Sequence, residues 1–208
     1  MSGFEVLKVK AGLPDPEEDV ERLRVVRDAA PRARLLLDPN GAWTPRQAAA
    51  LLPVSCGLGV EAVEQPVAPA TPKRWPRWPS ARRCRDRRRG RRRPGGRSRL
   101  AGRVHGVNVK LAKCGGPHAA LRIAETIAGS GTELMLGCLT ASSLGLAPAV
   151  HLAGLARWTD LDGHLLLAHD PWTGIGGEDG YVRTSGLPGL GVEPREVGPG
   201  PRAAVDAA

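Results

Sequence analysis

The chain has 208 residues, of which 41% are hydrophobic and 25% charged, with 27 Gly, 19 Pro and a formal net charge of +9. This apolar share excludes a wholly disordered or fibrous chain and suffices for one sizeable core. The apolar runs are far shorter than the roughly 18 residues of a membrane span, and no signal peptide follows Met1. We therefore expect a cytoplasmic, soluble protein without membrane contacts.

Short apolar strands alternate with helix-like stretches, which is typical of an α/β protein with a parallel sheet. In chain order, strands are predicted at residues 5–10, 33–38, 59–64, 104–110, 132–137 and 158–161, and helices at 16–30, 44–52, 117–128 and 142–157. From residue 174 onward Gly and Pro dominate, which predicts a loop-rich tail. Four widely spaced cysteines, Cys56, Cys84, Cys114 and Cys138, indicate reduced thiols rather than disulfides or a zinc site.

The positive charge belongs to a single segment. Residues 73–103 hold fifteen of the thirty Lys and Arg residues and one acid, Asp86, whereas the remainder has fifteen bases against twenty acids. Apart from this segment the chain therefore has the charge balance of an ordinary, slightly acidic enzyme.

Charged side chains stand at or just beyond the carboxyl ends of most predicted strands. They are Lys8, Lys10, Asp38, Glu64, Lys110, Asp160 and Asp162. Charged strand ends are costly in a buried parallel sheet unless they form a site, and the carboxyl ends of barrel strands carry catalytic groups. Each one alone has a simpler interpretation: a solvated loop residue, an Asx turn at Asp38, or a helix cap or turn at Asp160 and Asp162. Together they favour an active site.

The residues around these positions form six motifs, which are, in chain order, KVKAG, LLLDPNGAW, VEQPV, VNVKLAKCGG, GCLTASSLG and DLDG. In this order and spacing the chain resembles the enolase superfamily, specifically its dipeptide epimerases of the muconate-lactonizing type. The resemblance implies an incomplete TIM-type (β/α) barrel, without the family's N-terminal capping domain and first barrel strand. On this basis residues 1–67 hold barrel strands 2 to 4, residues 68–100 are an aberrant and disordered segment, residues 101–173 hold strands 6 to 8, and residues 174–208 form the tail.

The same resemblance implies the chemistry of the site. Lys10 and Lys110 would be two opposed bases that remove and return an α-proton. Lys8 lies on the same strand face as Lys10, so its charge is expected to lower the pKa of Lys10. Asp160 and Asp162 would hold the α-ammonium group of a small dipeptide substrate, with Lys8 also counted among the substrate-binding residues.

Asp38 and Glu64 match two of the family's three carboxylate ligands for one Mg²⁺ ion, which would stabilise an enediolate. The third carboxylate is missing. It is expected near Arg88, where the chain instead reads RRCRDRRRGRRR. Because the interval between Glu64 and Lys110 keeps about the family's length, we interpret the segment as a frameshift, with compensating frame changes near residues 68 and 100.

These observations predict metal-dependent epimerisation of dipeptides, impaired in this chain by the missing ligand and by loss of the fifth barrel strand. Two alternatives stay open at this point. One is a nucleic-acid-binding protein that uses the arginine-rich segment, with Trp75 and Trp78 as stacking platforms. It is less favoured, since arginine supplies fourteen of the fifteen bases. The other is a non-catalytic barrel fragment. The sequence also leaves open a homo-oligomer.

Overall fold

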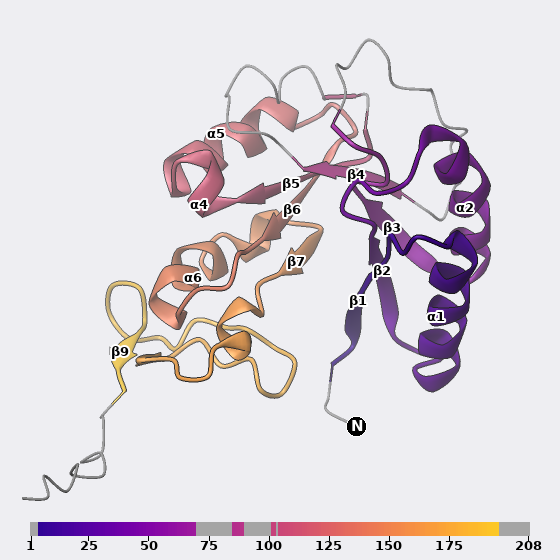
Figure 1. Ribbon diagram of the computed structural model, residues 1–208. Helices are drawn as coiled ribbons and strands as arrows, with labels where there is room; N and C mark the ends of the chain where they lie inside the picture. The colour runs from indigo at the N-terminus through magenta and orange to yellow at the C-terminus, as the bar shows by residue number, and fades with distance from the viewer. Residues whose placement is uncertain (1–3, 70–84, 90–100, 103, 196–208) are drawn as a thin grey trace, which may run out of the picture.

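In this computed structural model residues 4–69, 85–89, 101–102 and 104–195 are described, residues 85–89 by their backbone alone. Seven parallel strands form one sheet whose order follows the chain (Figure 1). They are β1 (Val6–Lys10), β2 (Arg34–Asp38), β3 (Val60–Glu64), β4 (Arg85–Arg89), β5 (Gly106–Lys110), β6 (Glu133–Gly137) and β7 (Trp158–Asp160). The predicted α/β class and parallel sheet are confirmed.

The four longer helices begin at a side-chain cap or at a proline. The helices are α1 (Pro16–Ala29), α2 (Pro45–Gly57), α4 (Leu111–Cys114), α5 (Pro117–Ile127) and α6 (Ser143–Val150), followed by the short 3-10 turns η2 (Ala153–Leu155) and η3 (Gly163–Leu166). Thr44 forms a capping box with Gln47 at the start of α2, and Asp15 caps α1. The predicted helix at 142–157 is too long, because α6 ends at Val150 and Gly154, a poor helix former, lies in η2.

The segment after β7 is largely loop. Within it β8 (Trp172–Thr173) and β9 (Glu193–Pro194) pair as two short antiparallel strands. Among the described residues, no helix is long and apolar enough to cross a membrane. Three of the four cysteines, Cys56, Cys114 and Cys138, are free thiols; Cys84 lies outside the described residues.

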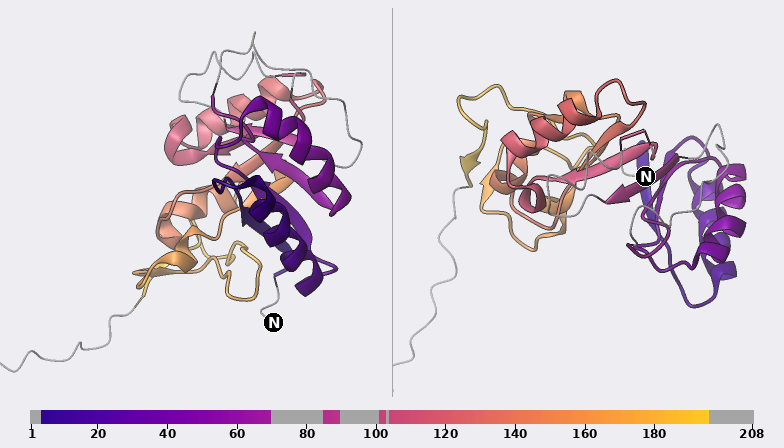
Figure 2. Two further views of the ribbon diagram at one scale, coloured as in Figure 1. Left: turned by 45° about the vertical axis from the view of Figure 1, so that its right-hand side comes forward. Right: turned by 90° about the horizontal axis from the view of Figure 1, so that it is seen from above.

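The core has two outer parts and one inner part. Figures 1 and 2 show α1 and α2 side by side against β1–β3, with α5 and α6 against β5 and β6. Between strands that are distant in the sheet order lies a small inner cluster, made of Leu36, Ala62, Met135 and Trp158. The Trp158 indole Nε1 also donates a hydrogen bond to Glu61 Oε1 at 2.6 Å. Because these contacts join β7 to β2 and β3, the sheet is curled, with an inner and an outer face.

The first and last strands approach each other at their carboxyl ends. No backbone ladder joins β1 to β7 in the sheet that the structure describes, yet Lys8 Nζ of β1 lies 2.5 Å from Asp160 Oδ2 of β7. Side chains rather than backbone hydrogen bonds therefore close the curl at this point.

The expectation that no strand forms in the arginine-rich segment is wrong. Residues 85–89 form β4, which pairs in parallel with β3 on one side and β5 on the other. Ladder hydrogen bonds use backbone groups, so an unfavourable composition can still form a strand between two paired neighbours. The sheet is therefore continuous from β1 to β7, and the middle of this segment is not a free arm. The expected disorder of the flanking residues 70–84 and 90–100 concerns residues outside those described.

Asp19 of α1 anchors the loop that follows β1. It is 3% exposed, and its carboxylate accepts hydrogen bonds from Gly12 N at 2.7 Å, Leu13 N at 3.3 Å and Trp43 Nε1 at 3.1 Å. This loop begins one residue after Lys10, so Asp19 also fixes the end of that strand.

We expect Asp19→Ala to lower the free energy of unfolding by about 2–4 kcal/mol, because it leaves the buried indole donor of Trp43 and two half-buried backbone donors unpaired. Urea denaturation measures this change. The exposed Asp28 of the same helix is the matched control, and Asp28→Ala should change stability by no more than about 0.5 kcal/mol. Equal effects of the two substitutions would contradict the anchoring role.

Candidate active site

Four charged side chains, which we call the polar layer, lie directly above the inner apolar cluster: Lys8, Asp38, Glu64 and Asp160. Side chains two residues apart on a strand point to the same face, and Asp38 follows Leu36, as Glu64 follows Ala62. In the same way Asp160 follows Trp158. At the carboxyl ends of the strands, the three carboxylates therefore lie above the apolar side chains of the inner cluster. These are positions at which the sequence predicts charged strand ends.

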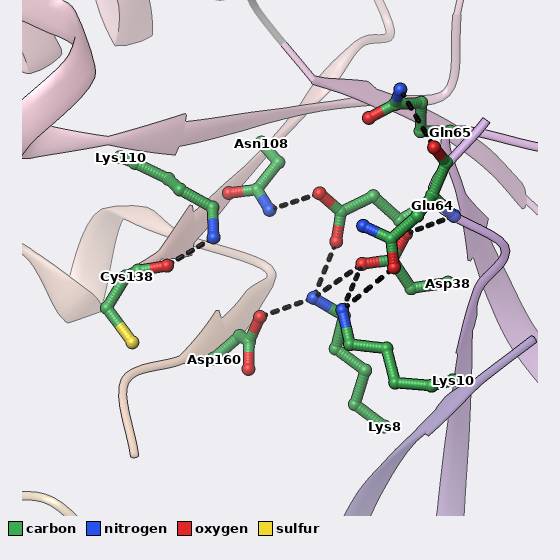
Figure 3. A network of polar contacts seen from close by, with 10 residues as sticks. Lys8, Lys10, Asp38, Glu64, Gln65, Asn108, Lys110, Cys138 and Asp160 are labelled. Carbon is green, nitrogen blue, oxygen red and sulfur yellow. Dashed lines mark hydrogen bonds and ion pairs between the residues drawn. The ribbon is translucent and has the colours of Figure 1, made fainter. Parts of the chain in front are cut away.

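Lys8 lies at the centre of this layer (Figure 3). Its Nζ is 2.5 Å from Asp160 Oδ2, 2.7 Å from Glu64 Oε2 and 3.3 Å from Asp38 Oδ2. Burial alone would lower the pKa of Lys8, but the charges of Glu64, Asp160 and Asp38 outweigh it and raise the pKa above its ordinary value. Lys8 is therefore an ammonium at neutral pH.

Lys10 reaches the same carboxylate from a more open position. Its side chain is 59% exposed, and its Nζ lies 2.9 Å from Asp38 Oδ2 and 3.1 Å from Asn40 Oδ1. The other oxygen of Asp38 accepts a hydrogen bond from Asn40 N at 3.0 Å. The Asx turn and the site role proposed for Asp38 are therefore both compatible with the structure, since they use different oxygens. Asn40 has φ 56°, a left-handed conformation that asparagine tolerates.

Lys110 approaches from the opposite side. It ends β5 and donates a hydrogen bond to the carbonyl oxygen of Cys138, just after β6. Figure 3 shows the amines of Lys10 and Lys110 directed toward the middle of the polar layer from opposite sides. The two amines therefore lie on opposite sides of the polar layer.

Asn108 is a site residue that the sequence reasoning missed. Its Nδ2 donates to Glu64 Oε1 at 2.7 Å, and its side chain is 2% exposed. A Cβ at Gly137 of the neighbouring strand would lie 2.6 Å from Asn108 Oδ1, so only glycine leaves room for this side chain. Its position two residues before Lys110, on the same strand face, was a signal that could have identified it.

The two aspartates of the DLDG motif are separated. Asp160 faces the polar layer and contacts Lys8, whereas Asp162 is exposed at the start of η3 and lies beyond the end of β7. Both are near enough to Cys138 for their charges to raise the pKa of its thiol. Asp160 is thus within the polar layer, and Asp162 is at its edge.

The chain is similar to a known protein family over nearly its whole length. The model of the family described as enolase C-terminal domain-like matches residues 1–198. The chain belongs to this family. One curated relative, the L-Lys-D/L-Arg epimerase of Methylococcus capsulatus, is 39% identical over 210 residues, covering 91% of this chain and 56% of the relative.

Solved dipeptide epimerases have a similar fold. A dipeptide epimerase from Methylococcus capsulatus, complexed with Mg and the dipeptide L-Arg-D-Lys, has a TM-score of 0.82 at 38% identity, covering 91% of this chain and 56% of that chain. The L-Ala-D/L-Glu epimerase of Bacillus subtilis, in a substrate-liganded complex, has a TM-score of 0.85 at 28% identity, covering 94% and 57%. This chain thus spans somewhat more than half the length of these relatives.

The strand register identifies the residue of β4 that is level with Glu64. Glu64 of β3 is in register with Arg87 of β4, and Arg89 is in register with Asn108 of β5. Arg88 is instead in register with Val107, which packs in the outer core cluster with α5. The position level with Glu64 is therefore Arg87, one residue before the position at which the sequence predicts the missing carboxylate.

The carboxylates of Asp38 and Glu64 are of the type that a hard divalent cation prefers, but they are too few to form a complete site. Asp38 and Glu64 have side chains that are 0% and 3% exposed and converge on one ammonium, and carboxylate oxygens are the ligands that Mg²⁺ prefers. Among the described residues, however, no group of three His, Cys, Asp or Glu side chains could hold a metal ion. Asp38 and Glu64 therefore supply two carboxylates, one fewer than the three ligands that the family resemblance implies.

The pKa of the Cys138 thiol depends on the charges at the carboxyl ends of the strands. Burial raises the pKa of its thiol, and the charges of Asp160 and Asp162 raise it further, against the lowering effects of a hydrogen bond with the Gly163 backbone and the charge of Lys110. A raised pKa means less thiolate near neutral pH, so Cys138 should react slowly with iodoacetamide.

We expect Asp162→Asn to speed the alkylation of Cys138 about two- to threefold, because the lost negative charge lowers the thiol pKa. Peptide mapping after timed labelling measures the rate. Cys56 on α2 is the internal control, since burial raises the pKa of its thiol without any contribution from these aspartates. An unchanged or slower rate at Cys138 would show that Asp162 lies too far away.

Proposed function

We propose that this chain carries the proton-transfer site of a dipeptide epimerase, with Lys10 and Lys110 as the two bases. The observation that carries the proposal is the approach of both amines to one carboxylate-lined layer from opposite sides (Figure 3). The names of the relatives support the substrate class, since the similar solved enzymes are dipeptide epimerases.

The reaction inverts one α-carbon of a dipeptide. One lysine, as the neutral amine, removes the α-proton, and the electron pair of the broken C–H bond moves into the adjacent carboxylate to give an enediolate. The other lysine, as the ammonium, donates its proton to the opposite face of the same carbon. Because the two amines approach from opposite sides, the new C–H bond has the inverted configuration.

The remaining polar side chains bind and orient the substrate. In this proposal the carboxylate of Asp160 releases Lys8 and binds the α-ammonium group of the dipeptide instead. Asp162 adds negative charge at the edge of the polar layer. Asn108 holds Glu64 in place through its amide. Asp38 and Glu64 would hold Mg²⁺, whose charge stabilises the enediolate when the ion is bound.

We propose that turnover is low in this chain. One carboxylate is missing at the register position of Arg87, and positive charge near a cation site opposes metal binding. The arginine-rich segment is not given a nucleic-acid role, because its described residues 85–89 form a central strand of the sheet.

Incubation of concentrated protein with Mg²⁺ and L,L-dipeptides tests the proposal. The substrates should have acidic, basic and apolar second residues, and chiral chromatography measures the appearance of the L,D-epimer. We expect slow epimer formation by the unmodified chain and none by Lys110→Met. Absence of an epimer from every dipeptide, or equal formation by both proteins, would refute the assignment.

A further inference from the structure

Lys8 is placed as a counter-ion rather than as a surface lysine. Its side chain is 13% exposed, and its Nζ contacts carboxylates from β2, β3 and β7 at 3.3, 2.7 and 2.5 Å. Two of these carboxylates, Asp38 and Glu64, are almost completely buried. Ionised carboxylates removed from water need a paired charge, and Lys8 supplies it from within the chain.

The contacts of Lys8 use the oxygens that a metal would need. Glu64 Oε2 and Asp38 Oδ2 face the ammonium, while Glu64 Oε1 and Asp38 Oδ1 accept hydrogen bonds from Asn108 Nδ2 and Asn40 N. Each of these carboxylates therefore has one oxygen held by the protein framework and one oxygen that contacts Lys8, and Asp38 Oδ2 also contacts Lys10 Nζ at 2.9 Å. A divalent cation on the second pair of oxygens would lie close to the ammonium, where like charges repel.

We propose that the Lys8 ammonium occupies the place of a metal ion and neutralises the carboxylates of Asp38 and Glu64. A divalent metal then binds these carboxylates only when Lys8 leaves their oxygens. The inference rests on the proposed function in taking Asp38 and Glu64 as the metal ligands. Lys8 then keeps the folded chain stable without metal and weakens metal binding, so it sets how much of the protein is metal-loaded.

Replacement of Lys8 by methionine tests the inference, because methionine keeps a long unbranched side chain and removes the charge. We expect Lys8→Met to bind Mn²⁺ at least about tenfold more tightly than the unmodified chain in isothermal titration calorimetry. Its Tm without metal should fall, and Mg²⁺ should raise it more than it raises that of the unmodified chain.

Lys10→Met is the matched control. Lys10 lies two residues along the same strand and contacts the same Asp38 oxygen, but its side chain is 59% exposed and lies in no ion pair with Glu64 among those described. Its loss should raise metal affinity much less. Equal gains in the two variants, or no gain in Lys8→Met, would overturn the inference.

A measurement on the unmodified chain covers the case in which Lys8→Met does not fold. Timed acylation of lysines, read by peptide mass mapping, should label Lys8 slowly without metal and faster as Mn²⁺ is added, while the exposed Lys113 reacts at a constant rate. Labelling of Lys8 that does not respond to Mn²⁺ would overturn the inference.

These readouts separate the inference from the proposed function. If Lys8→Met gains metal affinity while no dipeptide is epimerised, the counter-ion role stands and the epimerase assignment fails. If dipeptides are epimerised while Lys8→Met shows no gain, the assignment stands and the counter-ion role fails.

Discussion

Substitution of Arg87 by aspartate is expected to raise the affinity of the protein for Mg²⁺ by about tenfold or more. Arg87 is in register with Glu64, and paired positions on neighbouring strands lie about 4.8 Å apart. At the position in register with Glu64, the substitution replaces a positively charged residue by a third candidate carboxylate ligand. Calorimetric titration with Mg²⁺ measures the affinity, and dipeptide epimerisation below saturating Mg²⁺ should rise by a similar factor.

Arg88→Asp is the control for Arg87→Asp. It makes the same change of charge one residue later on β4, at the position in register with Val107 of the outer core cluster. General relief of positive charge would improve Mg²⁺ binding in both variants alike. A gain confined to Arg87→Asp supports the register, and a larger gain in Arg88→Asp would contradict it.

The second large effect concerns the two lysines separately. In the Arg87→Asp background, Lys10→Met and Lys110→Met should each lower epimerisation by about 10²–10⁴-fold, the usual contribution of a general acid or base. Each variant should nevertheless still exchange the α-proton of one epimer with solvent, because the remaining amine serves one face of the carbon. Proton NMR of L,L- and L,D-dipeptides in deuterated water follows the two exchanges.

The two variants should have opposite preferences. The epimer that still exchanges with Lys10→Met should be the one that fails to exchange with Lys110→Met. Loss of exchange for both epimers in both variants would indicate that the lysines act together on one face, which contradicts their placement on opposite sides (Figure 3).

The sequence predicted the strand ends well because their signal is local. A charged residue after a short apolar strand identifies a carboxyl end, and alternation then gives the face. Lys8, Asp38, Glu64 and Asp160 can therefore be identified as candidate site residues from the sequence alone. That Lys8 Nζ lies among all three carboxylates depends on how far the sheet curls, and no local pattern encodes the curl.

The sequence-based predictions were wrong or incomplete where neighbouring elements determine the local structure. The composition of residues 85–89 argued against a strand, but β3 and β5 both pair with these residues. The predicted helix at 142–157 ignored the cost of Gly154 and ended too late. Asn108 was missed because a neutral amide at a strand end carries no charge signal, although its contact with Glu64 holds the carboxylate in place.

The most direct test of opposed proton transfer is the isotopic composition of the epimer formed in deuterated water. If Lys10 and Lys110 act on opposite faces of one α-carbon, every L,D-dipeptide produced from an L,L-substrate should carry one solvent-derived deuterium at that carbon, and Lys110→Met should produce none. Formation of an epimer that keeps the original α-hydrogen, or deuterated epimer produced equally well without Lys110, would contradict the two-base site.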